Sequence, residues 1–383
     1  MSSDVEAFRD ELRSWLAGHP PPGIGAIPED VEALRAWQRS LHGGRWVAIH
    51  WPVEYGGRGA SPTQIAIYNE ELTRAHAPEI PGRAGVTLVG PTLMAHGTEE
   101  QRVRWMRRIL AADDIWCQLF SEPGAGSDLA GLSTRAEKRG DVYVVTGQKV
   151  WSSHAQIANW GIALVRTDPE ARRTKGISML AVPMGAKGVD VRPLRHITGE
   201  RGFNEVFLDE VEVPVENLIG PENEGWRVAG TTLVNERGAS FIWKEQVCHD
   251  VAIDLLCKAC AGAGLLHDPL VRQRLARSWI DVEIFRLHNA RTLARLARGE
   301  EIGAESSIVK LFWAGASQRL YETACDVLGP EALLMPGDWA RGLLSTRANS
   351  IMGGTSEIQR NIVAERTLGL PREPAVTKET VVR

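Results

Sequence analysis

The chain has 383 residues, of which 43% are hydrophobic and 24% charged, so it can bury large cores and we expect two or three structural units. Its formal net charge of -4, with acidic and basic residues interspersed, excludes a general attraction for nucleic acid or an anionic membrane. The polar, acidic start and the lack of a long apolar run predict no signal peptide, no membrane span and a cytoplasmic location.

The five cysteines are too few and too scattered to form a disulfide framework in a chain of this length. Cys257 and Cys260 have the spacing of a zinc or redox half-site, but their helical run contains no second ligand pair. We interpret them as helix-packing residues. The sequence therefore predicts no metal site.

The first part of the chain is expected to be helical, because its apolar residues recur every three to four positions. Thr98 is a good N-cap, and Gln101 stands at the capping-box position. We predict an N-terminal helical domain over residues 1–114. Its expected helices span residues 5–16, 27–41, 62–73 and 98–110.

The pattern then changes to short β-type runs separated by glycine, proline and aspartate. We predict a middle β domain, a barrel or sandwich, over residues 115–222. Its expected strands span residues 132–137, 142–146, 160–166, 177–182, 189–193 and 206–213.

Helical periodicity returns after the β domain and continues almost to the end of the chain. We predict a C-terminal helical bundle over residues 223–383, which makes the fold class α+β with the order α, β, α. Its expected helices span residues 226–261, 269–298, 301–328 and 355–368.

Two segments at the ends of expected strands carry small hydroxyl residues. Residues 121–128 read Ser-Glu-Pro-Gly-Ala-Gly-Ser-Asp, where proline fixes one φ angle and the glycines permit unusual ones. Residues 151–153 read Trp-Ser-Ser. The first segment can approach a flat or anionic ligand, although taken alone it is explained as well by an ordinary strand-ending turn.

Together these segments resemble the acyl-CoA dehydrogenase family, and the resemblance covers nearly the whole chain in the right order. Further matching segments are Asn159-Trp160, Gly176-Ile177-Ser178, Asn204-Glu205-Val206 and residues 354–360. The resemblance implies a helical N-terminal domain, a middle β domain and a C-terminal four-helix bundle. It also implies FAD as cofactor, an acyl-CoA substrate and an electron-transfer flavoprotein as electron acceptor.

The resemblance assigns a set of residues to FAD, although strand packing and turn capping could explain each one singly. Ser127 is assigned to the pyrophosphate or to the CoA of the substrate. Relatives often carry glutamine where Glu357 stands, and they hold the adenosine half of FAD with an Arg-x-x-Phe-Gly sequence that is absent here. Arg272 is a weak replacement, since a solvated helix start explains it equally well. The assigned residues are Gln118, Phe120, Ser121, Ser127, Trp151, Ser152, Ser153, Arg272, Thr355 and Glu357.

In many relatives the catalytic base is a glutamate where this chain has Gly353. A second position for the base is known in the family, on the first helix after the β domain, and Glu236 matches it. Among apolar neighbours a carboxylate there is expected to have a raised pKa, suited to accepting a proton, although pairing with Arg237 is the alternative. Gly353 keeps the backbone N–H that the resemblance assigns to the thioester oxygen. Substrate contacts are implied for Ser127, Asn235 and Arg237.

Our main hypothesis is FAD-dependent dehydrogenation of an acyl-CoA thioester to the trans-2-enoyl-CoA in fatty acid or lipid metabolism. In it Glu236 removes the α proton and flavin N5 takes the β hydride. Two alternatives are a non-catalytic or half-catalytic partner subunit of a heteromeric dehydrogenase, and a flavin oxidase or monooxygenase on the same fold. The family implies a homo-oligomer, dimer or tetramer, or a heterotetramer with a homologous subunit. The sequence leaves the length, branching and ring content of the acyl group open.

Overall fold

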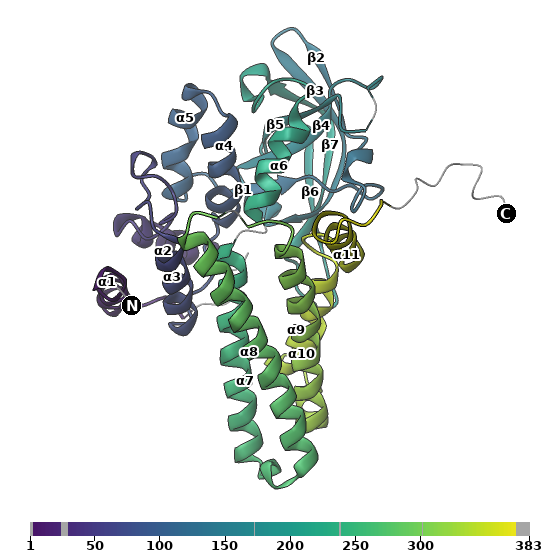
Figure 1. Cartoon of the computed structure of the whole chain (residues 1–383). Helices are drawn as coiled ribbons and strands as arrows, with labels where there is room; N and C mark the ends of the chain where they lie inside the picture. Colours follow the sequence, from purple (N-terminus) through teal and green to yellow (C-terminus); the bar gives the residue numbers. More distant parts are fainter. Residues whose placement is uncertain (1–2, 24–29, 172, 237–238, 301, 373–383) are drawn as a thin grey trace, which may run out of the picture. The chain divides into compact units, whose positions relative to one another are not determined.

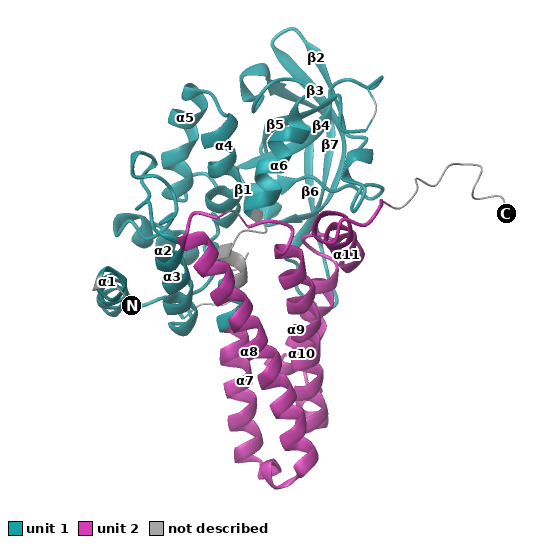
Figure 2. Ribbon diagram, viewed as in Figure 1, with its two compact units in different colours: residues 1–247 teal, residues 248–383 magenta. Residues whose placement is uncertain are grey.

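The protein is described by a computed structural model, which covers residues 3–23, 30–171, 173–236, 239–300 and 302–372 (Figure 1). The chain forms two compact units, residues 1–247 and 248–383, which Figure 2 shows in different colours. Within the described ranges no helix is both long and apolar enough to cross a bilayer.

The first part of unit 1 is helical, as the hydrophobic spacing predicts. Thr98 accepts a hydrogen bond from the Gln101 backbone N–H while the Gln101 side chain accepts one from the Thr98 N–H, which confirms the predicted capping box. Ser61 and Gln64 form a second capping box. The elements are α1 (Ser3–Gly18), α2 (Val31–Gly43), η1 (Val53–Tyr55), α3 (Pro62–Arg74), the π-helical turn η2 (Gly85–Val89), α4 (Gly90–His96) and α5 (Glu99–Leu110).

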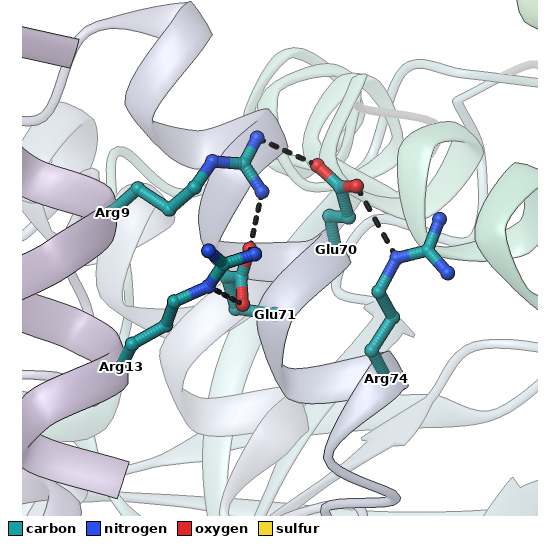
Figure 3. A network of polar contacts seen from close by, with 5 residues as sticks. All are labelled: Arg9, Arg13, Glu70, Glu71 and Arg74. Atoms are coloured by element: carbon teal, nitrogen blue, oxygen red, sulfur yellow. Dashed lines mark hydrogen bonds and ion pairs between the residues drawn. The ribbon is translucent and has the colours of Figure 1, made fainter. Parts of the chain in front are cut away.

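A network of ion pairs holds α1 against α3 (Figure 3). Arg9 pairs with both Glu70 and Glu71, and its Nη2 lies 2.8 Å from Glu70 Oε2. Arg13 Nε lies 2.8 Å from Glu71 Oε2. Arg74 completes the network through Glu70. Since Glu71 is only 6% exposed, its carboxylate depends on these two arginines in place of water.

The middle of unit 1 is one sheet of seven strands among the described residues, with the order β1-β4-β2-β3-β7-β6 and β5 paired to β4. β1 and β4 run parallel, whereas β3 and β7 form a long antiparallel pair. The strands are β1 (Trp116–Leu119), β2 (Arg135–Arg139), β3 (Val142–Ser153), β4 (Trp160–Arg166), β5 (Ile177–Pro183), β6 (Val189–Leu194) and β7 (Phe203–Pro214). Short turns are η3 (Leu129–Gly131), η4 (Ala155–Ile157) and η5 (Val215–Asn217).

Three tryptophans join the helices of unit 1 to its sheet. Trp105 of α5 meets Trp116 of β1 edge-on, with ring centroids 5.3 Å apart, and Trp116 stacks on Trp160 of β4 at 5.7 Å. Trp105 also meets Trp160 at 5.4 Å. Aromatic pairs of this geometry add directional attraction to the large area they bury, so α5 is fixed against the start of β1.

α6 (Gly225–Glu236) follows the sheet and packs against α4 and β5. Thr92 Oγ1 and Thr232 Oγ1 lie 2.9 Å apart, and His96 Nε2 lies 2.7 Å from Thr231 Oγ1. These buried and half-buried bonds fix the helix that carries Glu236. In the range 226–261, where helix was expected, the structure describes α6 and α7 (Ala239–Gly262), and residues 237–238 lie outside the described residues.

Unit 2 is a helical bundle with an apolar core drawn from α7, α8 (Pro269–Ala297) and α9 (Ser306–Leu328). Asp268 caps α8 by accepting a 2.8 Å hydrogen bond from Leu270 N. Cys260 is fully buried in this core with a free thiol, in agreement with its interpretation as a packing residue. The elements are η6 (Leu265–His267), α8 (Pro269–Ala297), α9 (Ser306–Leu328), η7 (Pro330–Leu333), α10 (Asp338–Ser345), η8 (Thr346–Ser350), α11 (Ser356–Ile362) and π-helical η9 (Val363–Thr367).

We expect Glu71→Gln to loosen α1, because two arginines lose the carboxylate that they share. Since Arg13 stays half-exposed, the cost should be about 2 kcal/mol, less than for a fully buried pair, which raises the population of the locally open state roughly 30-fold. Amide hydrogen exchange of α1, followed by mass spectrometry, measures this directly. Glu70→Gln is the matched control, because Glu70 is more exposed. Equal exchange in the two variants would contradict the anchoring role of Glu71.

Candidate active site

The end of β1 and the second half of β3 lie side by side, which brings the two hydroxyl-rich segments together. The Val150 backbone N–H donates a 2.9 Å hydrogen bond to the Ser121 carbonyl. Residues 121–128 therefore start at the strand that ends in Trp151, Ser152 and Ser153. The loop closes on itself through paired backbone bonds between Glu122 and Ala125, at 3.1 and 3.0 Å.

A buried ion pair ties the loop to β3. Lys149 is 0% exposed, and its Nζ lies 2.8 Å from Glu122 Oε1. The same ammonium donates to the carbonyls of Phe120, at 3.1 Å, and Leu164, at 2.7 Å. One cation therefore joins the end of β1, the loop and β4, and all three ammonium protons have an acceptor.

The carboxylate of this pair is equally well supplied with donors. Glu122 Oε2 accepts from the backbone N–H and the hydroxyl of Ser133, and Oε1 accepts from Thr134 N at 2.9 Å. Burial alone would raise the pKa of Glu122, but Lys149 and these donors lower it to about 2. Burial lowers the pKa of Lys149 to about 8, although Glu122 opposes the shift. Both groups are therefore charged at neutral pH.

The end of β3 turns an aromatic face outward. The pairing of β3 with β7 is irregular between Lys149 and Ser152, and Trp151 has a φ of 61°. Such a bulge re-aims a side chain, and the indole of Trp151 is 60% exposed. Ser152, by contrast, is buried, and its hydroxyl has no hydrogen-bond partner among the described residues. An exposed indole beside an unsatisfied buried hydroxyl fits a flat, hydrogen-bonding ring system.

The other residues assigned to this site lie on the same two strands or on the loop. Gln118 is half-buried on β1, where its backbone is paired with Ile162. Phe120 is buried, and its carbonyl is held by Lys149. Ser127 is exposed on the loop. The open space around the Cα atoms of Gly124 and Gly126 leaves the loop backbone accessible to a ligand.

In unit 2, Gly353 and Gly354 have φ angles of +64° and +91°, which strongly favour glycine. Their carbonyls accept from Gln359 Nε2 and Lys310 Nζ, at 2.9 and 2.8 Å. Thr355 caps α11 by accepting from Ile358 N at 3.3 Å. The positive φ angle at position 353 thus disfavours most residues other than glycine.

The two other assigned residues of unit 2 have partners of their own. Glu357 forms an exposed ion pair with Arg360 at 3.2 Å, and its own backbone N–H leads the causes that lower its pKa. Arg272 is exposed and donates to the carbonyls of Leu266 and His267, at 2.8 and 3.0 Å. Its guanidinium thus closes the turn before α8.

The residues around the candidate base lie at the end of α6. Asn235 Nδ2 donates to the Thr231 carbonyl at 2.9 Å, which is a contact within its own helix. Glu236 is the last residue of α6, and its side chain lies outside the described part of the structure. Arg237 also lies outside the described residues.

Sequence reasoning gave no role to Glu122 or Lys149, although Glu122 lies within the first recognised segment and Lys149 lies two residues before the second. A signal was present, because each is a lone charge of opposite sign beside a run that reads as a buried strand. Charges at such positions need partners, so the two could have been paired with each other.

Models of the acyl-CoA dehydrogenase family match three successive parts of the chain. The N-terminal domain matches residues 2–113, the middle domain residues 117–211 and the C-terminal domain residues 223–368. The chain therefore belongs to the acyl-CoA dehydrogenase family, whose members are oxidoreductase flavoproteins.

Individual relatives agree with this assignment over nearly their whole length. Acyl-CoA dehydrogenase IpdE1 of Mycobacterium tuberculosis is 40% identical, over 97% of this chain and 99% of its own. The solved Tcur3481-Tcur3483 steroid ACAD has a TM-score of 0.85 at 31% identity, covering 97% of this chain and 99% of its own. The ChsE4-ChsE5 complex from Mycobacterium tuberculosis has a TM-score of 0.84 at 32% identity, with the same coverage. The predicted α+β fold class is confirmed.

We expect Lys149→Met to destabilise unit 1 by about 3 to 5 kcal/mol, because it leaves the Glu122 carboxylate buried without its cation. Denaturant unfolding followed by tryptophan fluorescence measures this loss. Lys187→Met, on an exposed lysine of the same domain, should stay within about 0.5 kcal/mol of the parent. The double variant Lys149→Met/Glu122→Leu should recover much of the loss, since it removes both charges. No recovery would mean that the backbone bonds of Lys149, and not the ion pair, dominate.

Proposed function

We propose that the protein catalyses FAD-dependent α,β-dehydrogenation of an acyl-CoA thioester to the trans-2-enoyl-CoA. The observation that carries the proposal is the 2.9 Å hydrogen bond from Val150 N to Ser121 O, because it joins the two segments that flank the flavin in the family. The buried Lys149–Glu122 pair supports this, since it fixes both segments in one arrangement.

The residues on β1, β3 and the loop suit the ring system of FAD, which supplies a hydride acceptor when bound. Trp151 offers an exposed aromatic face, and Ser152 offers a buried hydroxyl without a partner. We assign the ring to these residues with Gln118, Phe120, Ser121 and Ser153, and the pyrophosphate side to Ser127. Thr355, Glu357 and Arg272 remain candidates for the rest of the cofactor on family resemblance alone.

We assign removal of the α proton to Glu236. At the family's usual position this chain has Gly353, and the φ of +64° there disfavours any other residue. Glu236 stands at the family's second position, on a helix fixed by the Thr92–Thr232 and His96–Thr231 bonds. The Gly353 N–H would donate to the thioester oxygen and stabilise the charge that develops there. Asn235 and Arg237 would contact the substrate.

The substrate and the assembly are proposed from the solved relatives. One of them is named a steroid ACAD and another a complex of two different chains. We propose a bulky, ring-bearing acyl group for this enzyme, for which a glycine at 353 leaves room, and electron-transfer flavoprotein as the electron acceptor. We also propose an oligomer, either of identical chains or with a homologous subunit.

Glu236→Gln should nearly abolish the bleaching of the flavin by substrate, with FAD still bound. Loss of a general base lowers a rate by about 100- to 10,000-fold. Anaerobic stopped-flow absorbance at the flavin band measures this rate. Glu224→Gln is the control, since Glu224 is an exposed residue paired with Arg227, and its rate should change by less than about twofold. Undiminished bleaching in Glu236→Gln would reject the assignment.

The chain purified alone should contain FAD and turn over an acyl-CoA. The absorbance spectrum measures the FAD content, and reduction of an artificial electron acceptor measures turnover. A chain that binds FAD and reacts only after a homologous subunit is added would instead be one half of a heteromeric enzyme. Rapid reoxidation of the reduced flavin by air would favour an oxidase.

A further inference from the structure

A group of charged side chains lies beside the end of β3, outside the residues that the family resemblance assigns. Lys244 Nζ lies 3.5 Å from Glu79 Oε1, and Arg83 Nε lies 3.2 Å from the same oxygen. His154 interacts electrostatically with Glu79 and Arg83. These four residues, which we call the distal cluster, come from three distant stretches of the chain.

The distal cluster has more positive than negative charge. Burial alone would raise the pKa of Glu79, but Arg83, Lys244 and His154 lower it to about 2, so its carboxylate is ionised. Burial lowers the pKa of His154, so its imidazole is neutral near pH 7. Two cations therefore share one carboxylate. The side chains of Lys244 and Arg83 are 42% and 48% exposed, which leaves both able to reach a ligand.

His154 carries an independent sign of a ligand. Its Nδ1 is buried and has no hydrogen-bond partner within the described residues. Its φ of 59° lies in the left-handed region, which is uncommon for residues other than glycine and is often found at functional sites. A buried ring nitrogen without a partner is costly unless a bound molecule satisfies it.

The position of His154 in the chain indicates which part of a bound substrate its side chain would contact. It follows Ser153 directly in the chain, so it lies next to the segment that flanks the flavin ring in the proposed function. The carbons that react must lie against that ring. In that arrangement, a side chain beyond the segment would meet the part of the acyl group that is remote from the thioester.

We propose that the distal cluster binds an oxygen atom on the remote part of the acyl group, so that the enzyme selects oxygenated acyl-CoA substrates. Lys244, Arg83 and the imidazole of His154 can all donate hydrogen bonds, so the oxygen is an acceptor such as a ketone or a carboxylate. A site built to bond such an oxygen rejects analogues that lack it, because its own polar groups are then left unsatisfied. The inference rests on the proposed function, which places the substrate beside Ser153.

The test compares three CoA esters built on one acyl group: 3-cyclohexylpropanoyl-CoA, its derivative with a ketone at C4 of the ring and its derivative with a carboxyl group at C4 of the ring. Binding is measured by calorimetry in FAD-loaded Glu236→Gln protein, which does not consume the esters. Lys244→Met is then added to this background. Lys258→Met is the matched control, because Lys258 is an exposed lysine on the same helix.

Both oxygenated esters should bind at least about tenfold more tightly than the plain ester. Lys244→Met should remove most of that advantage, more for the carboxylate than for the ketone, while Lys258→Met leaves it unchanged. Glu79→Gln should act in the opposite direction and strengthen binding of the carboxylate, since the two cations lose their shared partner. This second variant decides the matter if Lys244→Met does not fold.

Equal affinities for the three esters would overturn the proposal, as would equal losses in Lys244→Met and Lys258→Met. Flavin bleaching in the parent enzyme is recorded separately with the same esters. If none of them bleaches the flavin while the binding preference holds, the proposed dehydrogenation fails and the binding site stands. If the esters bleach the flavin but bind with equal affinity, the proposed dehydrogenation stands and the proposed binding site fails.

Discussion

The buried pair between Lys149 and Glu122 is the interaction on which the candidate site depends. Two charges without access to water are stable only when each has a full set of partners. Here the ammonium bonds a carboxylate and two carbonyls, and the carboxylate accepts from Ser133, Thr134 and Lys149. Because these partners come from the end of β1, the loop, the two residues before β2, β3 and β4, the complete set of bonds requires all five segments to be in place.

Because the Lys149–Glu122 pair fixes the second half of β3, the residues that follow Lys149 can adopt backbone conformations that cost free energy. Trp151 and His154 both have positive φ angles, and the β3–β7 pairing is irregular next to them. Backbone strain of this kind persists only where contacts with the surrounding structure stabilise the strained conformation by more than the strain costs. The result is an indole turned outward, together with a serine hydroxyl and an imidazole nitrogen that have no partner in the described part of the chain, all within four residues. A bound cofactor and substrate would supply hydrogen-bond partners for the Ser152 hydroxyl and the His154 ring nitrogen.

The sequence predicts the elements that local rules determine. The capping box at Thr98 and Gln101 and the strand at 160–166 appear as expected, since side-chain chemistry defines the first and a short run of apolar residues defines the second. It does not predict α10, because a short helix in a bundle is decided by packing between distant residues. For the site, motifs locate Ser121 and Trp151, whereas the distal cluster escapes notice because its four residues converge only in three dimensions.

The measurement that tests the account most directly is a crystal structure of the FAD-loaded protein with a non-reactive 3-thiaacyl-CoA. We predict the isoalloxazine against Trp151, Ser152 and Ser153, with the Glu236 carboxylate facing the α carbon from the side opposite the flavin. The thioester oxygen should accept a hydrogen bond from the Gly353 N–H. A Glu236 side chain turned to bulk solvent, or separated from the flavin by other residues, would contradict the account even with FAD bound as expected.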